Sequence, residues 1–202
     1  MIIPSRGSSG GLALFWKNEL QVNVIKYSMS NIDVEINSGD GFGWWHFTSF
    51  YGNPDSSSRD ESWSCLKYLS GISQLPWLVI GDFNELTGLS KKEGGAIRPA
   101  QQMQRFVDTL NWCGLHDKFT WLYQQADGTQ IRERMARAGA TCDWCIKFPQ
   151  AKLFNKTSSV SDHNPLLLQL FSRTQRKKHG KIFRFEAIWL KEASYEEVVS
   201  SS

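Results

Sequence analysis

The segment LVIGDFNE, residues 78–85, is the stretch from which the fold of this chain can best be predicted. An apolar run ends at Gly81, and a carboxylate and an amide follow at Asp82 and Asn84. A short apolar run of this kind is typical of a buried strand whose last residues project from a sheet edge. Side chains alternate in extended backbone, so Asp82 and Asn84 are predicted to point one way and Phe83 back toward the core. Asp82 and Asn84 are therefore candidates for handling a water molecule.

A turn is the competing interpretation of the same residues. Gly81-Asp82 is a common turn dipeptide, and in this case Asn84 caps the segment that follows. A second polar motif later in the chain favours a functional site. Ser161-Asp162-His163-Asn164-Pro165 again lies beside an apolar run, residues 166–170. The second motif therefore favours a functional role for Asp82 and Asn84 over a turn alone.

Together the two motifs resemble the endonuclease/exonuclease/phosphatase superfamily, the metal-dependent phosphodiesterases that include DNase I and the apurinic endonucleases. In that superfamily a Gly-Asp-x-Asn strand end and a Ser-Asp-His strand start meet across one active site. Further segments are similar, in the same order, to the endonuclease domain of plant non-LTR retrotransposons. They are Ser5-Arg6-Gly7, Gly10-Gly11-Leu12-Ala13-Leu14, Phe50-Tyr51-Gly52-Asn53-Pro54, Glu93-Gly94-Gly95, Phe119-Thr120-Trp121, Glu133-Arg134-Met135 and Phe183-Arg184-Phe185-Glu186.

The predicted fold class is α+β, and the resemblance implies a two-layer β-sandwich flanked by helices, as in DNase I. Residue patterns agree with such a layered domain. Strands are predicted at 12–16, 22–26, 32–36, 44–51 and 78–85, with a hairpin-type turn at 37–41. Two amphipathic helices are predicted, one after 56–58 and one from near 99. Their apolar faces comprise Trp63, Leu66, Leu69 and Ile72, and Met103, Phe106, Val107, Leu110 and Cys113.

The resemblance also implies catalytic roles. Phosphodiester hydrolysis needs an activated water, positive charge near the nonbridging oxygens and help for the leaving oxygen. By resemblance, Asp82 activates the water and Asn84 orients it. Asp162 helps to hold Mg²⁺, and His163 contacts the phosphate and shares in proton transfer. A histidine such as His163 is, taken alone, more often structural than catalytic, and the motif around it is what favours the catalytic role.

Three further residues complete the predicted site. Tyr51 matches the family's tyrosine on the phosphate side, with an ordinary core tyrosine as the alternative. Asn53 and Arg134 are candidates for binding the substrate, which is expected to be DNA and possibly RNA. Basic residues cluster between 173 and 181 and could contact a nucleic-acid backbone. A solvated linker is the simpler explanation of that cluster.

Departures from the family pattern predict an impaired or inactive copy, and two of them concern the catalytic groups directly. The family begins with two strands, the second ending in the glutamate that is the principal Mg²⁺ ligand, and this chain begins after both. We therefore expect a sandwich that is incomplete at the N-terminus and a weak affinity for Mg²⁺. Ala136 stands where the family's Arg-Leu-Asp-Arg motif has the aspartate that supports the catalytic histidine.

Composition and length set broader bounds. With 202 residues and 41% hydrophobic content, the chain can bury a substantial core. We expect a partial nuclease domain at 1–171, and at 172–202 a basic linker and the start of the segment that precedes a reverse transcriptase in such elements. No apolar run is long enough to cross a bilayer, and the N-terminus lacks the features of a signal peptide. A nuclear or cytoplasmic protein is expected, neither secreted nor membrane-bound.

Other hypotheses remain open at this point. Cys113 and His116, with Cys142 and Cys145, form two pairs at zinc-ligand spacing, although Cys113 falls on the apolar face of a predicted helix. The four cysteines of a chain without an export signal are otherwise expected to be reduced thiols. The alternatives to a nuclease are a noncatalytic nucleic-acid-binding remnant and a nonfunctional translated fragment.

Overall fold

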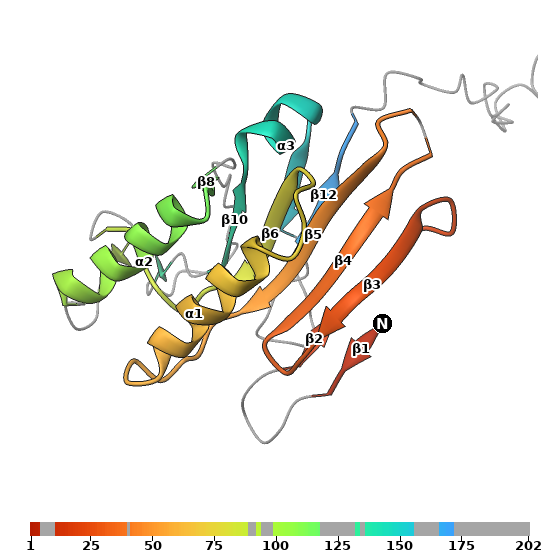
Figure 1. The fold of residues 1–202 in the computed structure, drawn as a ribbon. Helices are drawn as coiled ribbons and strands as arrows, with labels where there is room; N and C mark the ends of the chain where they lie inside the picture. Colours follow the sequence, from red (N-terminus) through yellow and green to blue (C-terminus); the bar gives the residue numbers. More distant parts are fainter. Residues whose placement is uncertain are drawn as a thin grey trace, which may run out of the picture. The chain divides into compact units, whose positions relative to one another are not determined.

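The computed structural model describes residues 1–4, 11–39, 41–88, 92–93, 99–117, 132–133, 136–155 and 166–171. The chain divides into two compact units, Met1–Phe171 and Ser172–Ser202, and all described residues belong to the first. Strands and helices both contribute to this unit, so the predicted α+β class is confirmed (Figure 1). In the described ranges, no helix has the length and apolar character required to span a membrane.

A six-stranded mixed sheet is the centre of the unit. The strand order is β3-β4-β5-β6-β10-β8. The strands comprise β3 (Gln21–Tyr27), β4 (Asn31–Asn37), β5 (Trp44–Tyr51), β6 (Trp77–Asp82), β10 (Ala136–Ala140) and β8 (His116–Asp117). Neighbours are antiparallel except for β5 and β6, which are parallel and are joined through a helix. The carboxyl ends of β5 and β6 therefore lie at the same edge of the sheet.

The central strands are buried on both faces. In β6, Val79 belongs to the hydrophobic cluster on one face and Ile80 to the cluster on the other. Alternation along β4 likewise directs Ile32 and Val34 into one cluster, as the residue pattern predicts. The hairpin-type turn predicted at 37–41 connects β4 to β5, and Gly39 there has the positive φ that glycine allows, at 70°.

Two helices cover one face of the sheet (Figure 1). These are α1 (Arg59–Ser70) and α2 (Ala100–Trp112). Their predicted apolar faces are confirmed, because Trp63 and Phe106 are buried and pack against each other with ring centroids 4.6 Å apart. Gly114, with φ of 65°, follows the end of α2. Burial of these aromatic faces against Phe83 ties the helices to the end of β6.

The other face is covered by shorter elements. They are β1 (Ile2–Ile3) with β2 (Leu12–Ala13), β11 (Lys152–Asn155) with β12 (Leu166–Gln169), and α3 (Cys142–Lys147). A further pair comprises β7 (Lys92–Glu93) and β9 (Arg132–Glu133). Each pair is a two-stranded sheet. The strand predicted at 12–16 is shorter than expected, because β2 ends at Ala13. The two-layer sandwich and its incompleteness at the N-terminus thus stay predictions.

A buried polar network within the central sheet was not predicted from the sequence. Asp33 Oδ1 accepts a hydrogen bond from the Thr48 hydroxyl and lies 2.8 Å from His46 Nε2. Trp77 Nε1 donates to Thr48 Oγ1 at 2.9 Å, and the His46 ring stacks on Trp77. Buried polar groups require partners of this kind. The network thereby fixes β4, β5 and β6 in one alignment.

Candidate functional site

Tyr51, Asp82 and Ala136 form a row across three neighbouring strands. Tyr51 on β5 is the direct partner of Asp82 on β6, and Ala136 on β10 is the direct partner of Asp82 on the other side. Directly paired residues of a sheet share one face. Tyr51 and Asp82 are both partly exposed, so two polar groups are accessible at this end of the sheet.

Two glycines allow the strand ends to approach closely. A Cβ atom at Gly81 would lie 1.7 Å from the Phe50 carbonyl oxygen, and one at Gly52 would lie 2.2 Å from the Phe83 carbonyl oxygen. Gly52 N–H donates to the Asp82 carbonyl oxygen at 2.7 Å. The glycine at which the apolar run ends is therefore required by backbone contact between β5 and β6.

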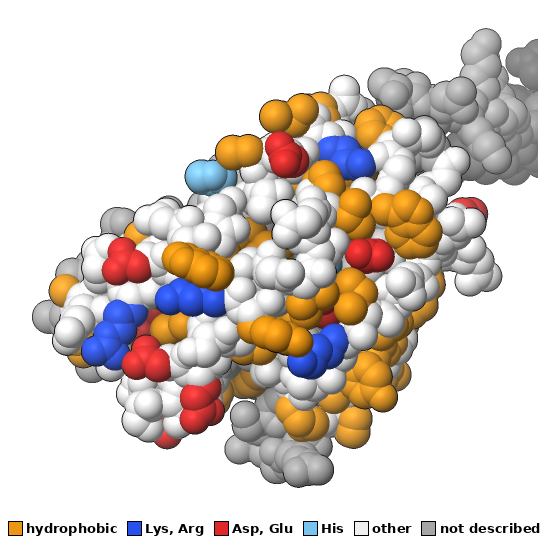
Figure 2. Space-filling model, viewed as in Figure 1, with side chains coloured by type: hydrophobic (Ala, Val, Ile, Leu, Met, Phe, Trp, Pro, Cys, Tyr) orange, Lys and Arg blue, Asp and Glu red, His pale blue; other side chains and the backbone are white. Residues whose placement is uncertain are grey.

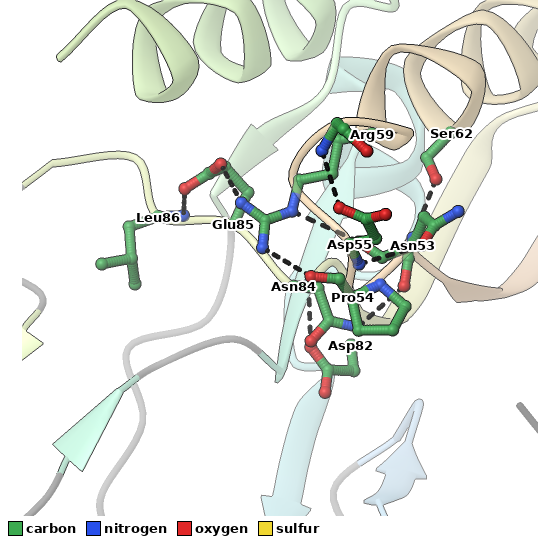
Figure 3. A network of polar contacts seen from close by, with 11 residues as sticks. Asn53, Pro54, Asp55, Arg59, Ser62, Asp82, Asn84, Glu85 and Leu86 are labelled. Carbon is green, nitrogen blue, oxygen red and sulfur yellow. Dashed lines mark hydrogen bonds and ion pairs between the residues drawn. The ribbon is translucent and has the colours of Figure 1, made fainter. Parts of the chain in front are cut away.

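Asn84 links the end of β6 to the end of β5. Its backbone N–H donates to Asp82 Oδ1 at 2.9 Å, and its Nδ2 donates to the Gly52 carbonyl oxygen at 2.7 Å (Figure 3). These bonds hold one carboxylate oxygen of Asp82 in a defined orientation. The Asp82–Asn84 bond forms a side-chain turn at the end of β6. The competing interpretation placed the turn at Gly81-Asp82, and both of those residues are still in β6.

The predicted strand continues too far at its carboxyl end. The structure ends β6 at Asp82, and Asn84 has a left-handed φ of 53°. Strict alternation therefore does not extend to Asn84, and that part of the prediction is wrong. The physical reason is that Asn84 tolerates the left-handed region and gains the bond to Gly52 there. Phe83 is buried as predicted, at 1% exposure.

Asn53 lies in the turn that follows β5. Its Oδ1 accepts a hydrogen bond from Asp55 N–H at 2.9 Å, and its N–H donates to Ser62 Oγ at 2.8 Å (Figure 3). The backbone N–H and the hydroxyl of Ser57 hold the pKa of the Asp55 carboxyl below its usual value. Asp55 therefore adds a stable negative charge beside Asn53 near neutral pH.

Arg59 and Glu85 form a buried ion pair behind the site, with Nη1 and Oε2 2.7 Å apart. The residue pattern after 56–58 predicted a helix that includes Arg59, but it did not predict the ion pair with Glu85. Glu85 directly follows Asn84, and this proximity was the only available sign that it belongs near the site. The pairing joins residues from two segments that only the tertiary fold brings together.

Three of the predicted site residues, Asp162, His163 and Arg134, lie outside the described residues. Their positions therefore remain predictions. Within the described ranges, no three His, Cys, Asp or Glu side chains lie close enough to hold a metal ion. Asp82 contributes one carboxylate at this edge, which itself accepts a hydrogen bond, and both oxygens of Glu85 accept hydrogen bonds. The described residues by themselves thus do not fit a preformed Mg²⁺ site.

The zinc hypothesis can be compared with the structure directly, because its four ligands are all described. Cys113 is buried just beyond α2, while Cys142 is exposed at the start of α3. Cys113, His116, Cys142 and Cys145 belong to no group of potential metal ligands in the described part of the chain. Burial raises the pKa of the Cys113 thiol to about 11, which disfavours the thiolate that zinc requires.

The two faces of the unit differ in the polarity of their surfaces. An apolar groove of about 430 Å³ lies on the face opposite the helices, with Leu14, Phe47 and Leu168 among its lining residues. Among the described residues that line the groove, Lys17 is the charged one. Over α1 and α2, acidic and basic side chains are intermixed, while hydrophobic side chains gather toward β1 and β3 (Figure 2). Neither surface, among the described residues, has the one-sided positive charge typical of a phosphate-backbone site.

The fold and the site define an α+β domain with a polar cluster at the edge of a mixed sheet. No protein-family model and no curated protein sequence matches the chain. Among solved structures, the chain is similar to the "Endonuclease domain of TRAS1, a telomere-specific non-LTR retrotransposon". The similarity covers 74% of this chain and 68% of that chain, with 18% identity and a TM-score of 0.48.

Proposed function

We propose that this chain is a DNase I-like domain of the plant non-LTR retrotransposon type, a phosphodiesterase that acts on DNA with low activity. The observation that carries the proposal is the strand-end geometry of the Gly-Asp-x-Asn motif. Asp82 accepts a hydrogen bond from Asn84 N–H. Asn84 Nδ2 donates to the carbonyl oxygen of Gly52, which lies between Tyr51 and Asn53. Four of the residues expected from the motifs thus lie at one edge of the sheet.

The chemistry available at this edge fits the handling of water and phosphate. A partly exposed carboxylate oriented by a hydrogen bond is suited to accept a proton from an attacking water molecule. Tyr51, the direct neighbour of Asp82, is suited to donate its hydroxyl to a nonbridging phosphate oxygen. The proposal includes weakly bound Mg²⁺ with Asp162 as its ligand, and His163 and Arg134 at the phosphate. A DNA substrate agrees with a nuclear or cytoplasmic location.

Low activity is proposed because of the residue at position 136. This position is paired with Asp82 in the sheet, and it matches the family's aspartate that supports the histidine. Alanine has no oxygen with which to orient His163, so the imidazole loses a partner that would keep it in the productive orientation. The pairing of Ala136 with Asp82 supports this part of the proposal.

The test is nicking of supercoiled plasmid in Mg²⁺ by the full chain and by Asp82→Ala and Asp82→Asn. We expect slow nicking that both variants reduce by about a hundredfold or more, since each removes the proton acceptor. Thermal unfolding of each variant provides the check that the fold is retained. Nicking that is independent of Asp82 would overturn the proposed role. DNA binding without any nicking would support the noncatalytic remnant instead.

A further inference from the structure

We infer that Arg59 and Glu85 are positioning residues, whose buried ion pair sets the geometry of Asn53, Asn84 and, through Asn84, the Asp82 carboxylate. The inference rests on the proposed function, because it assigns how that same site is held in place. Neither residue belongs to the motifs that identify the site, and they are far apart in the sequence.

The guanidinium group of Arg59 binds two different segments at once. Nη1 donates to Glu85 Oε2 at 2.7 Å, beyond the end of β6. Nη2 donates to the Pro54 carbonyl oxygen at 3.0 Å, and Nε donates to the Asn53 carbonyl oxygen at 3.2 Å, beyond the end of β5 (Figure 3). The planar fork of an arginine fixes the relative directions of these bonds. Arg59 therefore joins the segment that follows β5 to the segment that follows β6.

Glu85 uses both carboxylate oxygens in this arrangement. Oε2 accepts from Arg59, and Oε1 accepts from Leu86 N–H at 2.9 Å. Arg59 is 5% exposed and Glu85 is 1% exposed, so neither is positioned to touch a substrate. A buried pair keeps its charges only while both partners are present and hydrogen-bonded. The role of the pair is consequently to hold the backbone of the site.

The contacts form a closed circuit that includes the site residues. Arg59 binds the backbone of Asn53, and the preceding residue, Gly52, accepts a hydrogen bond from Asn84 Nδ2. Glu85 follows Asn84 and returns to Arg59 through the ion pair. The left-handed backbone of Asn84 lies within this circuit, and its N–H orients Asp82 Oδ1. Opening the circuit at Arg59 or Glu85 is therefore expected to loosen the Asp82 carboxylate.

The experiment compares Arg59→Gln, Arg59→Lys and Glu85→Gln with two matched controls. Lys67→Gln removes a partly exposed charge from the same helix, and Glu35→Gln converts a carboxylate that accepts a hydrogen bond from Ser73. Hydrogen exchange of the Asn84 and Gly52 amides reports the local geometry. Plasmid nicking, analysed as kcat and KM, reports the function. Exchange at amides of β3 and β4 serves as the internal reference in each variant.

We expect Arg59→Gln and Glu85→Gln to speed exchange at Asn84 and Gly52 by about tenfold, as for the loss of one net hydrogen bond. Their kcat should fall by roughly tenfold to a hundredfold with little change in KM, because misplacement of a catalytic group affects the chemical step. Arg59→Lys should show a partial effect, since a lysine has no planar fork. Both controls should match the unmodified chain in exchange and in kcat.

Unchanged exchange at Asn84 and Gly52 in folded Arg59→Gln or Glu85→Gln would overturn the inference, even if their melting temperatures fall. If those two variants do not fold, Arg59→Lys decides: faster exchange at Asn84 supports the inference, and unchanged exchange overturns it. If the unmodified chain neither nicks nor binds DNA, the proposed function fails. The exchange measurements then still determine whether the ion pair holds the strand ends.

Discussion

Ala136 on β10 lies directly opposite Asp82 on β6 in an antiparallel register. This pairing makes residue 136 the cross-strand neighbour of the carboxylate that the strand-end motif presents. The order β5-β6-β10 brings the two together, although they are separated by both α2 and β8 in the sequence. The chemistry of the Asp82 carboxylate should therefore be sensitive to the residue at 136.

Ala136→Asp places a second carboxylate opposite Asp82. Like charges directly opposite each other on neighbouring strands destabilise a sheet, here by about 0.2 to 1 kcal/mol. A pair of carboxylates also resembles the ligands that Mg²⁺ accepts in proteins. We expect a lower melting temperature without divalent cations and a gain on adding Mg²⁺. Ala136→Asn is the neutral control, and an equal response of both variants to Mg²⁺ would contradict the expectation.

Asn84 is expected to tolerate glycine better than alanine. Either substitution removes the bond from Nδ2 to Gly52, but alanine must also adopt the left-handed φ of 53°. That conformation costs a non-glycine residue roughly 1 to 2 kcal/mol. Urea unfolding should therefore show Asn84→Gly to be more stable than Asn84→Ala by about 1 kcal/mol. An Asn84→Ala protein as stable as Asn84→Gly would refute this explanation of the backbone.

Gly81→Ala should be strongly destabilising. The added Cβ would meet the Phe50 carbonyl oxygen at 1.7 Å, so the parallel strands β5 and β6 must separate locally. Overpacking of this kind costs about 1 to 3 kcal/mol or more. Gly88→Ala is the matched control, because nothing lies within 4 Å of a Cβ built there. Chemical unfolding of both variants measures the difference, and comparable stabilities would show that the contact relaxes easily.

Cys113 should make the stability of the protein decrease at alkaline pH. Burial raises its thiol pKa from 9.0 to about 11, partly offset by a hydrogen bond from Ser70 and the charge of Lys67. Between these two values the unfolded chain releases the thiol proton while the folded chain retains it. The unfolded state then binds fewer protons, so stability falls as pH rises from 9.0 to about 11.

Urea unfolding of Cys113→Ala alongside the unmodified chain isolates this contribution, because other groups that titrate in the same range are common to both. The unmodified chain should lose more stability over this pH range than the variant does. Parallel pH profiles would contradict the assignment. Alkylation offers an independent measurement, since the exposed Cys142 should react in the folded protein well before the buried Cys113.

The success of the strand and helix predictions reflects the local nature of burial patterns. β5 has the predicted bounds, 44–51, because its aromatic and β-branched residues favour extended backbone in almost any buried setting. The apolar faces of α1 and α2 were predictable because helical spacing places residues such as Trp63 and Leu66 on one side. By contrast, β10 comprises only small residues and one arginine, so its sequence carries no strand periodicity.

The sequence by itself determined which chemical groups stand at the end of β6, since Asp82 and Asn84 follow an apolar run that stops at a glycine. Only the tertiary structure decided what surrounds them. Pairing of β10 with β6 brings Ala136 opposite Asp82, and packing of α1 brings Arg59 to Glu85. Both contacts depend on backbone register and close packing between distant segments, whereas residue periodicity records only which face of each segment is buried.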